Sequence, residues 1–172
     1  MVLCDMNPVK LPKMTKKEIA DLIKGQMICR IAFKGEKAPY IAPFQYALID
    51  GKLYFHFTKY GRKIDLIKKG EPVCVEIEKT TPDMSEYAFV SLIGNLKIVE
   101  DPEERAKAIK KLAEEGKRRL SKNFLAAHGF NAEDGWDSLS PEKPLIIVKL
   151  ETVTDVVGLK SPKPPNKSKT EN

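Results

Sequence analysis

The stretch "LYFHFTKYGRK", Leu53 to Lys63, joins an alternating aromatic segment to a glycine and two adjacent cations. Immediately before it, Asp50-Gly51 separates this segment from another apolar run at 40–49. Asp-Gly between two such runs is a strong signal for a type I′ hairpin, because that turn needs positive φ at both central positions. We therefore predict an antiparallel hairpin here. One face of its second strand carries Leu53, Phe55 and Phe57, and the other carries Tyr54, His56 and Thr58.

The end of this strand has the chemistry of an anion site. Gly61, Arg62 and Lys63 come where a short helix is expected to begin, so unpaired backbone N–H groups lie beside two cations. Charge-assisted hydrogen bonds from Arg and Lys suit a phosphate group, and Thr58 adds a hydroxyl. The structural alternatives are that the two cations are solvated surface charges and that His56 is a packed strand residue.

Length and composition indicate one globular domain. The chain has 172 residues, of which 42% are hydrophobic, and none of its apolar runs is long enough to cross a bilayer. Asp5 interrupts the apolar stretch that a signal peptide needs, so we expect a cytoplasmic protein without a membrane partner. The net charge of +6 fits either an anionic ligand or a Lys/Glu-rich surface, and no nucleic-acid-binding module is recognisable.

Metal binding is not expected from the cysteine and histidine pattern. The three cysteines, at 4, 29 and 74, form no C-x-x-C pair, and the chain has two histidines, His56 and His128. Cys29 and Cys74 lie in strand-like segments and are interpreted as small buried residues.

The remaining sequence predicts two clearly marked helices, with short strands between them and a further strand after the second helix. Thr15 and Glu18 form a capping box for the first helix, and Asp101 caps the second with Pro102 at its first position. The expected strands span 27–33, 40–49, 53–58, 73–79, 87–99 with a bulge at Gly94, and 145–151. The region 124–144, which contains His128 and Trp136, is predicted to be irregular.

Antiparallel strands joined by short connections predict a small barrel with helices covering its openings or edges. The fold class is therefore mainly β, within the α+β group. We expect one domain over 1–160. Residues 161–172 offer no side chain for a core and are predicted to form a disordered basic tail.

The run from "PYIAPFQYALIDGKLYFHFTKYGRKIDLIKKGEPVCVEIE" to "SLIGNLKIVEDPEERAKAIKKLAE" resembles the FMN-binding split β-barrel of the pyridoxamine 5′-phosphate oxidase superfamily. The similarity is nearest to the branch that includes nitroimidazole-reductase-related flavoproteins, and it covers about residues 15–150. Its most specific parts are "PY..P", "LYFH" followed by "GRK", and "G…V.D..ER..A". The resemblance implies a six-stranded antiparallel split β-barrel with flanking helices.

The resemblance also implies a set of FMN-binding residues. Arg62 and Lys63 would hold the phosphate, with Thr58 beside them. The isoalloxazine ring would run along Ala42, Pro43, Phe44 and Gln45, together with His56 and Phe57. Proteins of this family are homodimers with two flavin sites at the subunit interface, so the partner chain would contribute Val90 and Ser91, and Trp136 is a further candidate.

By this resemblance the chain is expected to be a flavin-dependent oxidoreductase or reductase acting on a small molecule, with His56 as a candidate for proton transfer. The pyridoxamine phosphate oxidases engage their substrate with an Arg and a His near the C-terminus, and this sequence has neither after Trp136. Gly61 also stands where those oxidases have a Ser. The alternatives are a non-catalytic flavin-binding, electron-carrier or sensor protein, or a relative that holds deazaflavin F420 or haem.

Overall fold

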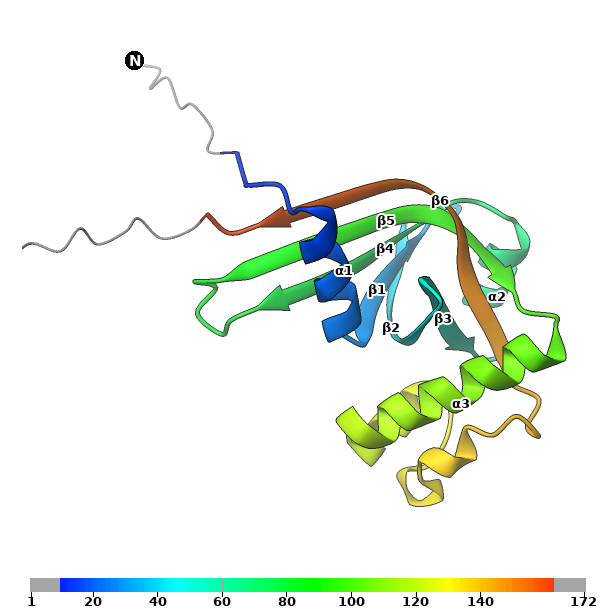
Figure 1. Cartoon of the computed structure of the whole chain (residues 1–172). Helices are drawn as coiled ribbons and strands as arrows, with labels where there is room; N and C mark the ends of the chain where they lie inside the picture. The colour runs from blue at the N-terminus through cyan, green and yellow to red at the C-terminus, as the bar shows by residue number, and fades with distance from the viewer. Residues whose placement is uncertain (1–9, 60, 163–172) are drawn as a thin grey trace, which may run out of the picture.

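The computed structural model describes residues 10–59 and 61–162 (Figure 1). Its helices are α1 (Lys16–Gly25), α2 (Arg62–Lys68) and α3 (Pro102–Arg119), with 3₁₀ helices η1 (Lys122–His128), η2 (Ala132–Asp134) and η3 (Trp136–Ser138). Its strands are β1 (Ile28–Phe33), β2 (Tyr40–Ile49), β3 (Lys52–Phe57), β4 (Val73–Thr80), β5 (Tyr87–Ile98) and β6 (Ile146–Lys160). Beyond Pro162, the predicted C-terminal tail lies outside the described residues.

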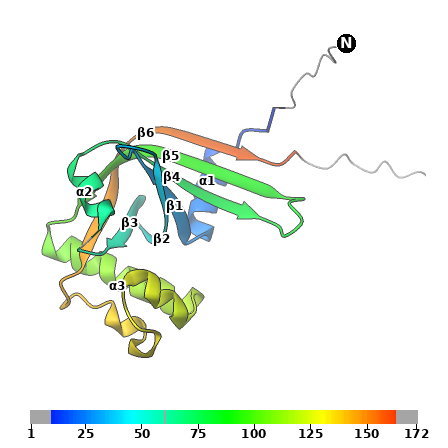
Figure 2. The ribbon, with the colours of Figure 1, turned by 180° about the vertical axis from the view of Figure 1, so that it is seen from behind.

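The six strands form a closed antiparallel barrel in the order β1-β2-β3-β6-β5-β4. This confirms the predicted fold class, a six-stranded antiparallel barrel with flanking helices. Figure 1 shows that β4, β5 and the last part of β6 extend together past the barrel, whereas α3 lies outside the barrel wall, next to β2, β3 and β6. Seen from behind in Figure 2, the 3₁₀ segments lie beside α3, and α2 lies at the side of the barrel.

The predicted turn chemistry is confirmed at the β2–β3 hairpin. Asp50 has φ 49° and Gly51 has φ 78°, the two positive values that a type I′ turn requires. The bulge predicted at Gly94 is also present, as a register shift between Ile93 and Asn95 in the pairing of β5 with β6. A Cβ at Gly94 would lie 2.8 Å from the carbonyl oxygen of Glu151, so the two strands approach here only because the side chain is absent.

Strand β2 pairs with a different neighbour along each of the two parts of its length. It pairs with β1 from Tyr40 to Gln45, but with β3 only from Tyr46 to Ile49. Pro43, which has no N–H to donate, lies in the half that pairs with β1 alone, as the predicted edge position requires. Residues 40–45 therefore form an open lip of the barrel within the described part of the chain.

Strand β6 is longer than the sequence indicates. The predicted strand ended at Glu151, whereas the structure continues pairing β6 with β5 as far as Lys160. Residues 152–157 are all exposed, and Thr152 has φ 49°. The alternation of buried and exposed side chains that identifies a strand is lost here, although the backbone hydrogen bonds continue.

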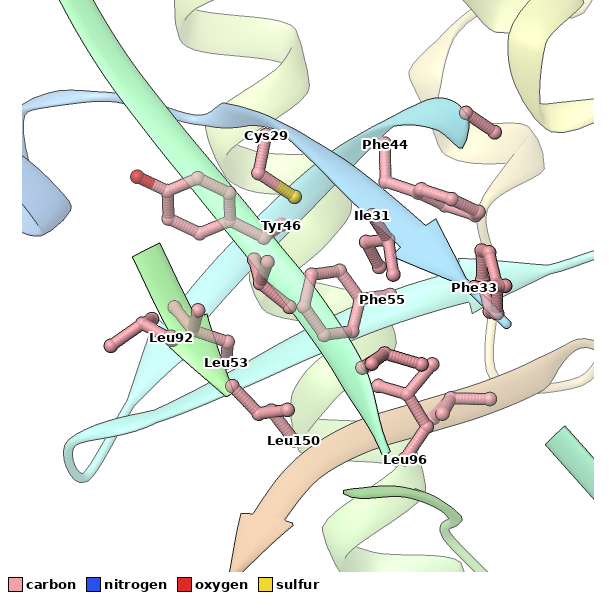
Figure 3. Packing of buried hydrophobic residues seen from close by; sticks show 14 of the residues in the cluster. Cys29, Ile31, Phe33, Phe44, Tyr46, Leu53, Phe55, Leu92, Leu96 and Leu150 are labelled. Carbon is pink, nitrogen blue, oxygen red and sulfur yellow. The ribbon is translucent and has the colours of Figure 1, made fainter. Parts of the chain in front are cut away.

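Two separate apolar clusters stabilise the fold. The first fills the barrel, and Figure 3 shows Ile31, Phe44 and Phe55 gathered between its strands. The second lies outside the barrel, where Leu112 of α3 and Leu125 of η1 pack with Ala47 of β2. The region predicted to be irregular thus supplies much of a second core, because η1 to η3 place Leu125, Trp136 and Leu139 against α3 and the barrel wall.

Among residues 10–59 and 61–162, no helix is both long and apolar enough to cross a membrane.

Candidate functional site

A hollow at the open lip of β2 brings most of the predicted site residues together. From β2 and β3 it is lined by Pro43, Phe44, Gln45 and His56, from the segment after β3 by Thr58 and Lys63, and from η1 by Phe124, Ala127 and His128. These residues span three separate parts of the chain. The predicted constellation is therefore assembled in space, and η1 adds a wall that the sequence did not indicate.

The two adjacent cations lie over different aromatic rings. The Nζ atom of Lys63 lies 5.0 Å from the ring centroid of Phe44 and 6.0 Å from that of Phe57. Arg62 is exposed, and its guanidinium lies 5.8 Å from the ring centroid of Tyr40. Only Lys63 lines the hollow, so the two residues would hold an anion from different sides or serve different groups.

Lys63 is a half-buried cation without a carboxylate close enough for an ion pair among the described residues. Burial lowers the pKa of its ammonium group from the ordinary value. A cation taken partly out of water over two aromatic rings gains from the ring faces but keeps its hydrogen-bonding capacity for an anion. This is the arrangement expected of a phosphate-binding lysine.

Two of the predicted ring-contacting residues lie behind the hollow rather than in its wall. Ala42 and Phe57 are buried in the barrel cluster. The ring of Phe57 stacks on that of Phe44, with centroids 4.6 Å apart and an interplanar angle of 22°. Phe57 therefore supports the wall of the hollow through Phe44, which lines it.

Val90 and Ser91, the residues expected from a partner chain, lie on β5. Val90 is fully buried in the barrel of its own protomer. Ser91 is half-buried and pairs with Val157 of β6. Their contribution to a partner's site stays a prediction, and Ser91 is the one of the two whose side chain is not taken up by the barrel core.

A chain of buried polar side chains forms the back of the hollow. The Nδ1 atoms of His56 and His128 are 3.1 Å apart, and Nε2 of His128 lies 2.9 Å from Oε1 of Gln45. Gln45 in turn donates from Nε2 to the carbonyl oxygen of Leu112, at 2.8 Å. Burial lowers the pKa of both imidazoles, and the neighbouring His128 and Lys63 lower that of His56 further. Both rings are therefore neutral at pH 7.

Sequence reasoning missed His128 and Phe124 as site residues. They lie about 70 residues after His56 in a 3₁₀ helix whose short period gives no amphipathic signal. Trp136 packs behind them, with its ring edge-on to His128 at 5.9 Å. Histidine is rare in this chain, and the presence of only two was the one available hint that they could form a pair.

The hollow is small in the single protomer. Its volume of about 20 Å³ has room for about one water molecule, whereas sites for cofactors usually enclose about 300–1,000 Å³. A groove of about 700 Å³ lies between α1 and the ends of β4, β5 and β6, but its Lys160 is already paired with Glu18 and none of the predicted site residues line it. The smaller hollow is lined by hydrogen-bond donors and acceptors, but by itself it is too small to enclose a cofactor.

The fold and the site together define a small six-stranded antiparallel barrel with a cationic hollow at its open lip. Comparison with known proteins shows which family has this barrel. The family model described as pyridoxamine 5′-phosphate oxidase matches residues 15–129. The chain therefore belongs to the pyridoxamine 5′-phosphate oxidase family. None of the curated proteins matches the chain significantly.

Several solved structures have the same fold at low sequence identity. A FAD-binding protein from Mesorhizobium loti is 16% identical, with a TM-score of 0.64 over 90% of this chain and 98% of that protein. A conserved hypothetical protein from Mycobacterium tuberculosis is 18% identical, with a TM-score of 0.64 over 92% and 95%. A candidate 5-nitroimidazole antibiotic resistance protein from Bacteroides thetaiotaomicron is 17% identical, with a TM-score of 0.60 over 90% and 92%. At these identities the likeness shows the fold.

Proposed function

We propose that this chain is a flavin-binding protein, that its flavin is FMN, and that it acts as a flavin-dependent oxidoreductase or reductase on a small molecule. The observation that carries the proposal is the Lys63 ammonium group, half-buried over the Phe44 ring at the mouth of the hollow. Similar folds include a protein described as FAD-binding, which supports a flavin without distinguishing FMN from FAD.

The residues at the hollow fit the chemistry of FMN. Lys63 supplies a charge for the phosphate group, with the Thr58 hydroxyl beside it, and Arg62 adds a second cation from the exposed side. Phe44 offers an apolar surface for a flat ring, and the open lip of β2 offers backbone groups. A bound flavin would supply the electron-transfer chemistry.

We also propose that the working unit is a homodimer with its flavin sites at the subunit interface. The hollow of about 20 Å³ is too small for a three-ring cofactor, so a second copy would supply the missing cover. Exposed apolar side chains are available for such an interface. They are Ile41 on the lip of β2, which is 61% exposed, and Ile93, Val153, Val156 and Val157 on β5 and β6.

The second candidate function is a non-catalytic flavin-binding or electron-carrier protein, and the state of His56 favours it. His56 was the candidate for proton transfer, but burial lowers the pKa of its imidazole to about 3. An imidazole with so low a pKa carries no imidazolium proton to donate at pH 7 and is only a weak base, whereas general acid–base catalysis works best with a pKa near the working pH. Any reaction that we propose here would therefore rely on the flavin and on protons from substrate or solvent.

The first experiment is to identify the chromophore. Protein purified from cells is heated to release its ligand, which is then identified by mass, with FMN as the expected result. Release of FAD would show that the bound flavin is FAD rather than FMN. Release of deazaflavin F420 or haem would contradict the proposal that the chain binds a flavin. Turnover of reduced nicotinamide with an acceptor separates the enzyme from the non-catalytic alternative.

The second experiment measures FMN affinity in matched variants. Lys63→Ala removes a charge-assisted hydrogen bond worth about 1.5–3 kcal/mol, so affinity should fall by roughly one to two decades. Lys68→Ala is the control, because this lysine is exposed at the other end of α2. Equal affinities for the two variants would contradict the phosphate site.

The third experiment tests the dimer. Light scattering of the FMN-loaded protein is expected to give twice the mass of the chain. A stable monomer that retains FMN would contradict an interface site.

A further inference from the structure

The orientation of the Gln45 amide is fixed by a single contact. The carbonyl oxygen of Leu112 is an acceptor only, so the group 2.8 Å from it must be the NH₂ of Gln45. A carbonyl has two lone pairs, which allows Leu112 to accept this bond as well as a helical one. The amide oxygen of Gln45 therefore faces His128, and it can only accept.

This orientation determines the tautomer of both histidines. His128 must carry a proton on Nε2 in order to donate to the Gln45 oxygen, at 2.9 Å. In a neutral imidazole the other nitrogen then holds a lone pair, so Nδ1 of His128 is an acceptor. Nδ1 of His56, 3.1 Å away, must be the donor. His56 therefore keeps its proton on Nδ1 and has a lone pair on Nε2.

The chain of hydrogen bonds is not a route for protons. It ends at an amide and a backbone carbonyl, neither of which takes up a proton near neutral pH. The Leu112 carbonyl oxygen nevertheless determines which group donates in every hydrogen bond of the chain. Reversing any one of these bonds would leave two acceptors or two donors facing each other. The arrangement thus orients His56 rather than supplying it with protons.

We propose that Gln45 and His128 are positioning residues that hold His56 as a hydrogen-bond acceptor through Nε2, so that the site recognises a planar ring bearing an N–H donor at its edge. The recognition step rests on the proposed flavin site, and a flavin has such a donor in its imide N–H. The tautomer itself does not depend on that function. Lys63, the cation that lowers the pKa of His56, further disfavours a protonated ring.

The tautomer is tested by ¹⁵N NMR of the ligand-free full chain, labelled at histidine and prepared without a histidine tag. Because the chain has only two histidines, the spectrum contains four ring nitrogens. His128 is assigned by its contacts with Trp136, the only tryptophan. The expected result is a proton on Nε2 for His128 and on Nδ1 for His56. A proton on Nε2 of His56 would overturn the proposal.

Two substitutions at Gln45 test whether this residue determines the tautomers of His128 and His56. Gln45→Leu removes the acceptor, so His128 should lose its fixed tautomer and show averaged ring-nitrogen shifts. Gln45→Glu places a carboxylate beside His128, which should charge that ring and reverse the bond to His56, moving its proton to Nε2. Gln26→Leu makes the same chemical change beyond the C-terminus of α1 and should leave all four signals unchanged. Unchanged His56 signals in both Gln45 variants would refute the positioning role.

The recognition step is tested with FMN and with FMN methylated at the imide nitrogen. The wild-type chain should bind the methylated compound about tenfold more weakly, whereas Gln45→Glu should bind both compounds equally and weakly. Equal binding of the two compounds by the wild-type chain would overturn the acceptor role of His56. If neither compound binds, the proposed function and the recognition step both fail, and the NMR result alone still decides the tautomer.

Discussion

The two faces of β3 are both buried, but by different parts of the molecule. Leu53, Phe55 and Phe57 point into the barrel, where they belong to an apolar cluster built from the strands with side chains of α1 and α2. Tyr54 and His56 point outward and are covered by α3 and by η1. The inner face is apolar throughout, whereas every outward side chain named here carries a polar group with a hydrogen-bond partner.

This difference shows where a binding site can arise in a small barrel. The apolar side chains of the interior are satisfied by packing against one another, so changes there should affect stability. The outward face needs partners for its polar groups, and these partners come from segments far along the chain. At the end of β3 the outer cover stops short of Lys63, and the hollow lies at that boundary.

The largest effect on stability should follow from Phe55→Ala, which removes a ring from the inner face of β3. Phe55 is fully buried and packs edge-on against Phe44, with ring centroids 6.2 Å apart. Loss of this ring leaves a cavity and should lower the free energy of unfolding by about 3–5 kcal/mol. Chemical denaturation measures it. A loss below about 1 kcal/mol would mean that the barrel interior collapses around the gap.

The second-largest effect on stability should come from Gly116→Ala in α3, one of the segments that cover the outward face of β3. A Cβ at Gly116 would lie 2.3 Å from the ring of Trp136, so the ring must move and disturb His128 beside it. The clash should cost about 1–3 kcal/mol and outweigh the better helix propensity of alanine. Denaturation and tryptophan fluorescence are the measurements. Gly25→Ala, where a Cβ would meet no atom within 4 Å, is the control and should not destabilise the protein.

A pH titration should distinguish the faces, since only the outer one buries histidines. The folded pKa values of His56 and His128 lie at about 3 and about 4, below the ordinary value near 6.5. Between these limits the unfolded chain binds more protons, so the free energy of unfolding falls as the pH decreases from about 6.5 towards 4. Each histidine contributes up to about 1.4 kcal/mol per pH unit.

The double variant His56→Phe with His128→Leu is the comparison for this titration. Its stability should depend less on pH over the same window, although carboxylates with lowered pKa values, such as that of Glu104, still contribute below it. Parallel curves for the two proteins would show that the imidazoles titrate alike in the folded and unfolded states.

The smallest effect should follow from Tyr54→Phe, at the far end of the outer face. The Tyr54 hydroxyl donates to a Glu104 carboxylate oxygen at 2.7 Å, and Lys149 also holds that carboxylate, at 2.9 Å. Because Lys149 remains as a partner, the loss should be about 0.5–1.5 kcal/mol. Thermal unfolding measures it. A cost as large as that of Phe55→Ala would mean that the outer face is not the more tolerant one.

The inner barrel could be predicted from the sequence because its signals are local. Asp50-Gly51 specifies the turn, and alternation assigns Phe55 to one face and His56 to the other. The residues of the hollow were expected on two grounds: the cation pattern after β3 indicated Lys63, whereas Phe44 and Gln45 followed only from the family resemblance. The continuation of β6 past Glu151 was not predictable, because its residues show no alternation and are held by pairing with β5.

The sequence by itself determined the barrel, its hairpin and the cation at the end of β3, because turn geometry and side-chain alternation act over a few residues. Only the tertiary structure decided that His128 faces His56 and that Lys63 and Arg62 lie over different aromatic rings. The first fact depends on a contact between segments about 70 residues apart, and the second on contacts of the two cations with rings of β2. No local propensity encodes either. The physical reason is that buried polar groups must find partners wherever the fold supplies them.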